Sequence, residues 1–155
     1  MNKQYKLYLA YGSNLNIEQM SIRCPEAKVI NKTVIEHYQL LFRGGNQSAV
    51  ATIEPKWNSA VPVLVWAISP SDETELDFYE GYPKLYRKQT IKVHLNGKRA
   101  KAMVYIMNDG RQLNTPNECY LETIREGYET AGFDLTMLRR AVLNSITNES
   151  PTLSK

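Results

Sequence analysis

The segment Tyr11-Gly12-Ser13-Asn14-Leu15 has the residue types of an anion-binding turn. A strand that ends in Gly-Ser-Asn and leads into a helix N-terminus presents consecutive backbone N–H groups outward, and the helix dipole strengthens their attraction for negative charge. Such a turn would hold a carboxylate or a developing oxyanion. The same residues also fit a plain tight turn, with Asn14 in a left-handed conformation and no ligand.

A second segment that could take part in chemistry lies at the end of a predicted helix. It is Leu76-Asp77-Phe78-Tyr79-Glu80-Gly81. Glu80 stands at the C-terminal end of that helix, where the helix dipole disfavours negative charge, and it follows two aromatic residues. It is therefore either an exposed acid without a role or an acid held in an apolar pocket. In the pocket, burial would raise its pKa and make it an acid–base group near neutral pH.

Other common catalytic arrangements have no support in the sequence. His37 and His94 lie in predicted strands without metal-ligand spacing. The two cysteines, Cys24 and Cys119, are too few for a four-ligand zinc site. Ser13 does not lie in a G-x-S-x-G elbow, and neither a G-x-G-x-x-G nor a P-loop motif is present. We therefore expect no metal site, no nucleotide site and no serine or cysteine nucleophile.

Composition limits the class of protein. The chain has 155 residues, 43% of them hydrophobic and 23% charged, which is typical of a globular domain that builds its own core. No long apolar run and no export signal are present, so we expect no membrane span and a cytoplasmic location. The net charge of +3 is mild, and we expect no nucleic-acid partner. We predict a single domain over residues 1–147 and a flexible tail over residues 148–155.

The elements expected around both segments are mostly strands. Alternation predicts a strand over residues 5–11, and Asn16 with Gln19 predicts the cap of a short helix that Pro25 ends. Asn96-Gly97 is typical of a type I′ hairpin turn. The remaining predicted strands cover residues 29–35, 38–42, 50–53, 61–68, 86–95 and 99–107, with punctuation at Gly44-Gly45-Asn46 and Pro55.

Three longer helices are also expected. The first begins after Ser69-Pro70 and ends at Gly81. The second has Thr115 as its cap and Pro116 at its first position, and the third is capped by Asp134. These elements predict an α+β fold with a mostly antiparallel sheet, or a partly closed β-barrel, flanked by helices.

Together the two chemical segments resemble the γ-glutamylcyclotransferase-like family. The family's Y-G-S-N-[LM] loop is matched by residues 11–15, and its L-D-x-x-E-G segment is matched by residues 76–81. Further agreement lies in Arg23-Cys24-Pro25, Ala51-Thr52-Ile53-Glu54-Pro55, Trp66, Tyr86-Arg87 and Tyr120, so the resemblance runs over about residues 5–133. One departure is Val63, where the family often has a glycine.

The resemblance implies an acyl-transfer reaction without a cofactor. The α-amine of a γ-glutamyl compound attacks its own γ-amide carbonyl, and 5-oxoproline and a free amine are released. Glu80 is implied as the catalytic acid–base group, because a carboxylate with a raised pKa can take a proton from the α-ammonium and return one to the leaving amine. The residues implied in substrate binding are Tyr8, Tyr11, Gly12, Ser13, Asn14, Tyr86 and Tyr120, with the turn amides holding an anionic group and the tyrosines donating hydrogen bonds.

This interpretation explains why the chain has ten tyrosines but only three phenylalanines and two tryptophans. A cavity for a small zwitterion needs apolar walls with a few placed hydroxyls, and tyrosine supplies both. About half of the tyrosines are expected at the pocket. Sheet, turn and helix packing is expected for Tyr5, Tyr38, Tyr82, Tyr105 and Tyr128.

Three questions stay open at the level of sequence. The leaving group of the small-molecule γ-glutamyl substrate is either an amino acid or an amine, and the loops at 43–47 and 108–114 are expected to recognise it. A non-catalytic small-molecule or protein-binding module on the same scaffold is the alternative, although such a module has no reason to keep a costly buried acid at Glu80. The chain is either a monomer or a homodimer.

Overall fold

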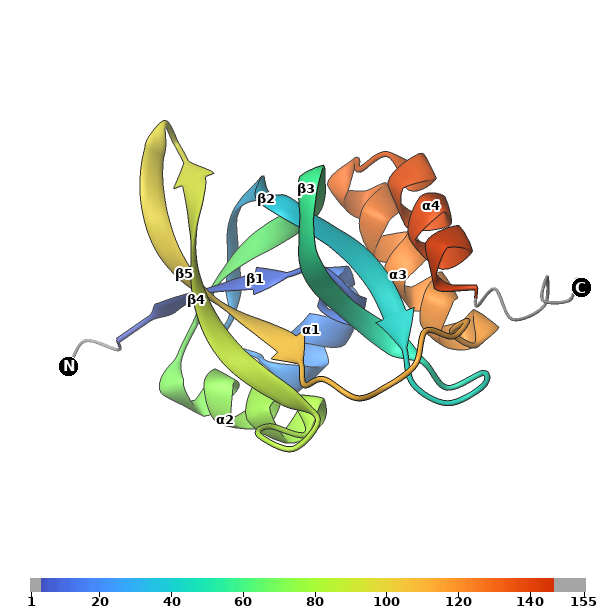
Figure 1. Cartoon of the computed structure of the whole chain (residues 1–155). Coiled ribbons are helices and arrows are strands. Elements are labelled where there is room, and N and C mark those ends of the chain that lie inside the picture. Colours follow the sequence, from blue (N-terminus) through green and yellow to red (C-terminus); the bar gives the residue numbers. More distant parts are fainter. Residues whose placement is uncertain (1–3, 147–155) are drawn as a thin grey trace, which may run out of the picture.

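A curved five-stranded sheet forms the centre of the molecule (Figure 1). The computed structural model describes residues 4–146, so the tail predicted at residues 148–155 lies outside the described residues. The strands are β1 (Lys6–Ala10), β2 (Lys28–Arg43), β3 (Val50–Ile68), β4 (Tyr86–Leu95) and β5 (Lys98–Met107), in the spatial order β2-β3-β1-β5-β4.

The short strand β1 occupies the middle of the sheet. It runs antiparallel to β3, with Lys6 opposite Ile68, and parallel to β5, with Tyr8 opposite Met103. The other neighbouring strands pair antiparallel. Within residues 4–146 the edge strands β2 and β4 share no backbone ladder, and the Thr33 hydroxyl donates to the His94 backbone carbonyl over 2.7 Å. The α+β class and the mostly antiparallel sheet are confirmed, and the sheet does not close into a complete barrel.

Four short strands predicted between residues 29 and 68 are two long strands. Glu36 pairs with Ala60 and Tyr38 pairs with Pro55, so His37 alone stands opposite residues 56–59. His37 has a φ of 66° and Asn58, on the strand with the extra residues, has a φ of 69°, so both strands leave regular β geometry here. The prediction that Pro55 interrupts the strand was wrong, because the bulge absorbs the irregular residues while the hydrogen-bond ladder continues on either side.

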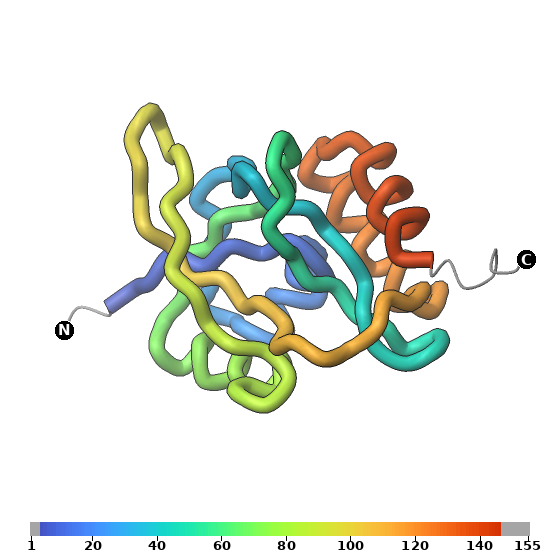
Figure 2. The backbone as a smooth tube through the Cα atoms, in the orientation of Figure 1, coloured from blue at the N-terminus to red at the C-terminus, as the bar shows by residue number. Residues whose placement is uncertain are grey.

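Helices surround the sheet in two groups (Figures 1 and 2). The elements are the 3-10 turn η1 (Ser13–Leu15) and the helices α1 (Ile17–Arg23), α2 (Pro70–Glu80), α3 (Glu118–Ala131) and α4 (Leu135–Ser145). Helices α3 and α4 lie together on one side of α1, and α2 lies on the other. None of the helices within residues 4–146 is long and apolar enough to cross a membrane.

Helix caps follow the sequence in most places. Ser69 and Asp72 form a reciprocal capping box at the start of α2, and Gly81 ends that helix with a φ of 65°. The predicted start of α3 was wrong by two residues. The side chain of Asn117 accepts from the Tyr120 N–H over 2.8 Å, and this cap places the first helical residue at Glu118.

The hairpin of β4 and β5 is confirmed at its turn. Asn96 and Gly97 both have positive φ angles, of 53° and 80°, as a type I′ turn requires. The turn leaves Leu95 opposite Lys98 and therefore sets the register of the whole hairpin. At the far end of the hairpin, this register brings Tyr86 and Tyr105 to the region where β1 ends.

Candidate active site

One cavity of about 230 Å³ collects every residue that the sequence places in the site. It lies where β1 leads into η1, beside the C-terminal end of α2. The predicted residues that line it are Glu80, Tyr8, Tyr11, Gly12, Ser13, Asn14, Tyr86 and Tyr120. The wall is completed by Val50, Ala51, Tyr79, Leu85 and Tyr105.

The Gly12–Asn14 segment is a single 3-10 turn. The N–H of Leu15 donates to the Gly12 carbonyl and the N–H of Asn16 donates to the Ser13 carbonyl, both over 3.0 Å. In such a turn the first N–H groups have no acceptor inside the turn, so those of Ser13 and Asn14 are available to another group. Asn14 does not have the positive φ of the plain turn considered above.

The turn is held in place from α3. The Asn16 side chain caps α1 by accepting from the Gln19 N–H over 3.1 Å, and its amide donates to the Thr123 carbonyl over 3.0 Å. At Gly127 of α3, an added Cβ would lie 2.6 Å from Leu15 Cβ and 2.8 Å from the Leu15 carbonyl carbon. The absence of a side chain at Gly127 therefore lets α3 press directly against the turn.

Polar side chains connect the turn to Tyr8 and Arg23. The Asn14 amide nitrogen donates to the Tyr8 hydroxyl over 2.8 Å, and an Arg23 guanidinium nitrogen donates to the Asn14 amide oxygen. The guanidinium lies over the ring of Tyr79, 3.5 Å from its centroid, and the Tyr79 hydroxyl is 2.9 Å from the Ser13 hydroxyl. The turn, α1 and α2 are thus joined at one side of the cavity.

Two of the tyrosines predicted to donate hydrogen bonds to a ligand use their protons inside the protein. The Tyr11 hydroxyl donates to the Tyr105 carbonyl over 2.6 Å, and the Tyr86 hydroxyl donates to the Ala51 carbonyl. Because a hydroxyl has a single proton, both groups offer lone pairs to a ligand, and the expected donor role is corrected for them. Tyr120 differs, since its hydroxyl accepts from the Ala51 N–H over 2.9 Å and keeps its proton.

Glu80 is a half-buried acid without a partner. Within residues 4–146 its carboxylate makes no hydrogen bond and no ion pair. Burial raises its pKa to about 7, although the positive charge of Arg23 acts in the opposite direction. Burial raises the pKa of five surrounding tyrosines, and the charge of Glu80 raises it further, so each of these hydroxyls lies within the electrostatic reach of Glu80. They are Tyr8, Tyr11, Tyr86, Tyr105 and Tyr120.

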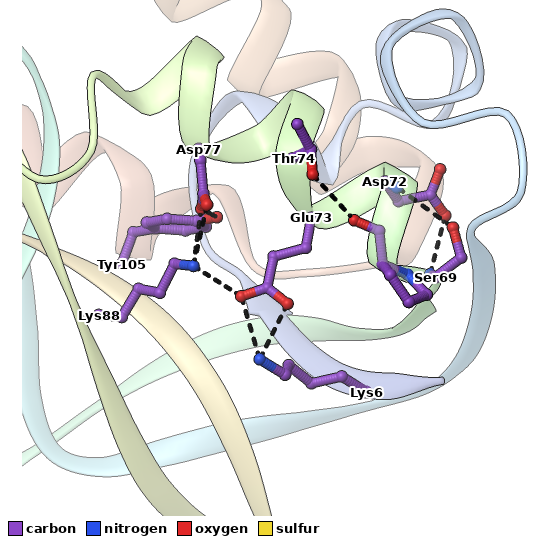
Figure 3. Close-up of polar contacts among 9 residues, drawn as sticks. Lys6, Ser69, Asp72, Glu73, Thr74, Asp77, Lys88 and Tyr105 are labelled. Carbon is purple, nitrogen blue, oxygen red and sulfur yellow. Dashed lines mark hydrogen bonds and ion pairs between the residues drawn. The ribbon is translucent and has the colours of Figure 1, made fainter. Parts of the chain in front are cut away.

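The helix that carries Glu80 is held by a chain of polar contacts (Figure 3). One turn before Glu80, the Asp77 carboxylate accepts from the Tyr105 hydroxyl over 2.6 Å and from Lys88 over 3.0 Å. Lys88 also binds Glu73 over 2.6 Å, and Glu73 accepts from Lys6 over 3.0 Å. These contacts link α2 to β5, β4 and β1.

Tyr105 is the main residue that sequence reasoning missed. It was expected in packing, yet it lines the cavity and binds Asp77. The hairpin register could have predicted this position. The Asn96-Gly97 turn pairs Tyr105 with Lys88, which lies two residues beyond Tyr86 on the same face of β4. Val50, Ala51 and Leu85 have no chemical side chain and gave no signal.

The two loops expected to recognise the leaving group run next to each other (Figure 2). The N–H of Gly44 donates to the Gln112 carbonyl over 2.9 Å, and the N–H of Asn114 donates to the Phe42 carbonyl over 3.1 Å. The first loop leads directly into Val50 at the cavity wall. Among residues 4–146, no group of three or more His, Cys, Asp or Glu side chains is placed to hold a metal ion.

Comparison with known proteins identifies the family. A family model described as gamma-glutamyl cyclotransferase, AIG2-like, matches residues 8–127. The chain belongs to this family. The match includes all the residues that the sequence places in the site, from Tyr8 to Tyr120. A search of curated proteins found no match.

Solved structures of the same fold agree. One described as gamma-glutamyl cyclotransferase is 26% identical, with a TM-score of 0.76 over 93% of this chain and 89% of that one. An uncharacterized human protein is 27% identical, with a TM-score of 0.79 over 94% of this chain and 89% of that one. YkqA from Bacillus subtilis, at 19% identity and a TM-score of 0.77, covers 93% of this chain and 56% of its own, and shows the fold alone.

Proposed function

We propose that the protein is a cyclotransferase that converts a γ-glutamyl amino acid or γ-glutamyl amine into 5-oxoproline and a free amine. The observation that carries the proposal is the unpaired Glu80 carboxylate in a tyrosine-lined cavity that also includes the Gly12–Asn14 turn. Membership of the gamma-glutamyl cyclotransferase, AIG2-like family supports it.

In the proposed reaction the substrate supplies both reacting groups. The α-nitrogen forms a bond to the γ-carbonyl carbon, and the bond between that carbon and the amide nitrogen breaks. One proton leaves the α-ammonium and one arrives on the departing amine. A small cavity serves this reaction by folding the flexible glutamyl chain, so that the nitrogen approaches the carbonyl at near-contact distance.

Glu80 is proposed to move both protons. With a pKa of about 7, it is ionised in a large fraction of molecules at neutral pH and can accept a proton from the α-ammonium. The protonated acid can then donate to the leaving amine. Lone pairs of Tyr11 and Tyr86 lie around the same cavity and suit the ammonium, since their protons are bound to backbone carbonyls.

The alternative of a binding module is weaker on physical grounds. A site that only binds would be more stable with the carboxylate of Glu80 paired, because burying an unpaired acid costs free energy. A catalytic acid–base group has the opposite requirement, since a partner in the resting site would lower its pKa and occupy its oxygens. The missing partner of Glu80 therefore favours a catalytic role for this cavity over binding alone.

The experiment is a comparison of Glu80→Gln with Glu75→Gln, an exposed acid on the same helix. Release of 5-oxoproline from a panel of γ-glutamyl amino acids and amines is measured for both variants and the parent. We expect the kcat of Glu80→Gln to fall at least about 10³-fold with KM little changed, and Glu75→Gln to match the parent. For the parent, kcat/KM should rise with pH to a plateau, with an apparent pKa of about 7.

Two outcomes would count against the proposal. If Glu80→Gln keeps more than a few per cent of the parent kcat, Glu80 is not the acid–base group. If the folded parent releases no 5-oxoproline from any member of the panel, the binding module becomes the better account. The panel also identifies the leaving group, because an amino-acid leaving group carries a carboxylate and a simple amine does not.

A further inference from the structure

The tyrosine hydroxyls around the cavity are not equivalent. A tyrosine hydroxyl has one proton to donate and lone pairs that accept, so its protein partner decides what remains for a ligand. The hydroxyls of Tyr11, Tyr86 and Tyr105 donate to protein acceptors and retain only lone pairs. Those of Tyr8 and Tyr120 accept from protein donors and retain their protons.

The direction of the bond to Tyr8 is set by Arg23. A guanidinium carries only donors, so the group of Asn14 that faces Arg23 must be the amide oxygen. The amide nitrogen then faces Tyr8 and must donate to it. Arg23 is itself held, since it lies over the Tyr79 ring and donates to the Gln19 side chain over 3.2 Å. The proton of Tyr8 is thereby free for the cavity.

Tyr120 brings a second proton close to the same place. An added Cβ on Gly12 would lie 3.2 Å from Ala51 Cβ and 3.7 Å from the Tyr120 hydroxyl, so the turn and Tyr120 face each other closely. The Ala51 N–H donates to that hydroxyl, which leaves the Tyr120 proton unused. The free N–H groups of the turn and two hydroxyl protons therefore belong to one cavity, which Glu80 also lines.

We propose that Arg23 and Asn14 act as a relay that fixes Tyr8 as a hydrogen-bond donor to the oxyanion formed on the γ-carbonyl of the substrate. This inference rests on the proposed cyclotransferase function. As the α-nitrogen bonds to the carbonyl carbon, the π electrons move to oxygen, and Tyr8 stabilises that charge without transferring its proton. Charge on Arg23 polarises the amide and strengthens the Tyr8 donor. Tyr8 acts as a catalytic residue beside Glu80, and Asn14 and Arg23 are positioning residues.

Asn14→Asp tests the relay by reversing one hydrogen bond. The aspartate is nearly the same size and still accepts from Arg23, but its second oxygen has no proton to donate. The Tyr8 hydroxyl would then donate to the new carboxylate and lose its role toward the substrate. A Tyr8→Phe variant loses the same donor by removing the hydroxyl. Asn31→Asp is the control, because Asn31 is an amide outside the cavity, bonded to Asn96.

The measurement is 5-oxoproline release by the full chain with each variant and with the double variant Tyr8→Phe/Asn14→Asp. We expect each single variant to lower kcat about 10²-fold with KM within a few-fold of the parent. The double variant should be no slower than the slower single variant, because both changes remove one donor. Asn31→Asp should match the parent.

Several results would overturn the relay. Asn14→Asp with a kcat within threefold of the parent would do so, and so would a double variant whose loss is the product of the two single losses. In either case an active parent leaves the cyclotransferase proposal standing, whereas an inactive parent removes both. If Asn14→Asp does not fold by circular dichroism, Arg23→Met replaces it. That change frees the amide to rotate and should lower kcat about tenfold, while an unchanged kcat would overturn the relay.

Discussion

Helices α2 and α3 both bring side chains into the cavity, but they are held mainly by different forces. Helix α3 presents Tyr120, and behind it Ile124 and Tyr128 are fully buried against the core. Helix α2 presents Glu80, and its buried residues are only Leu76 and the capping acid Asp72. Apolar packing dominates for α3, which also bonds through the Tyr120 hydroxyl and the Thr123 carbonyl, whereas hydrogen bonds and ion pairs dominate for α2.

The difference matches what each side chain is proposed to do. Hydrophobic contact is not directional and stabilises a helix as a whole, which suffices for a wall residue such as Tyr120. The contacts of Asp77 with Tyr105 and Lys88 are directional and lie one helical turn from Glu80. They therefore set the rotation of α2 about its axis, and with it the direction of the carboxylate.

The largest effect on stability is expected where α3 meets the turn. Gly127→Ala places a Cβ within 3.0 Å of three Leu15 and Asn16 atoms, two of them in the backbone, which cannot move aside cheaply. We expect the free energy of unfolding to fall by about 3 kcal/mol. The measurement is urea denaturation followed by circular dichroism.

The sign of the change in stability decides whether α3 depends on this close contact. In an open helical position, Gly→Ala raises stability by roughly 0.5–1 kcal/mol, because alanine is the better helix former. A stabilised or unchanged Gly127→Ala variant would show that α3 does not depend on close contact with the turn. The contrast between the two helices would then fail.

The second effect concerns the free energy that Glu80 costs the fold. Its pKa is raised to about 7 in the folded state from 4.5, so the folded protein binds the proton more tightly than the unfolded chain does. This contribution to stability is complete below pH 4.5 and is lost as pH rises through 7. Glu80→Gln should therefore stabilise the protein by about 2 kcal/mol at pH 8 and by much less at pH 4.5.

Thermal or chemical unfolding at the two pH values checks this expectation. The exposed acid in Glu75→Gln gives the matched control, for which no comparable pH-dependent gain is expected. If Glu80→Gln were equally or less stable than the parent at pH 8, the carboxylate would not be held at a cost, and its proposed acid–base role would lose its physical basis.

The sequence predicts which residues gather in one cavity better than it predicts the scaffold around them. The loop and the L-D-x-x-E-G segment are local patterns, and Glu80 and Asn14 do meet in one cavity. The continuation of β2 past His37 depends on pairing with β3, and the cap at Asn117 depends on competition between neighbouring caps, so local periodicity misses both. The direction of each tyrosine hydroxyl hydrogen bond also depends on residues far along the chain. Whether Tyr11 donates or accepts depends on the carbonyl of Tyr105, far along the chain.

The smallest effect is expected for Lys88→Met, which tests most directly whether polar contacts orient α2. Lys88 bridges Glu73 and Asp77, and all three side chains are partly buried, so its loss leaves two acids facing each other on α2. We expect a loss of about 1 kcal/mol in stability, larger at low salt than at high salt, together with a severalfold lower kcat and an unchanged KM. Lys92→Met on the same strand is the control, because Lys92 is exposed and stands opposite Lys101. Its removal should be neutral or slightly stabilising, since like charges directly opposite each other repel. Equal kcat values for Lys88→Met and Lys92→Met would mean that apolar packing alone orients α2, as it does α3.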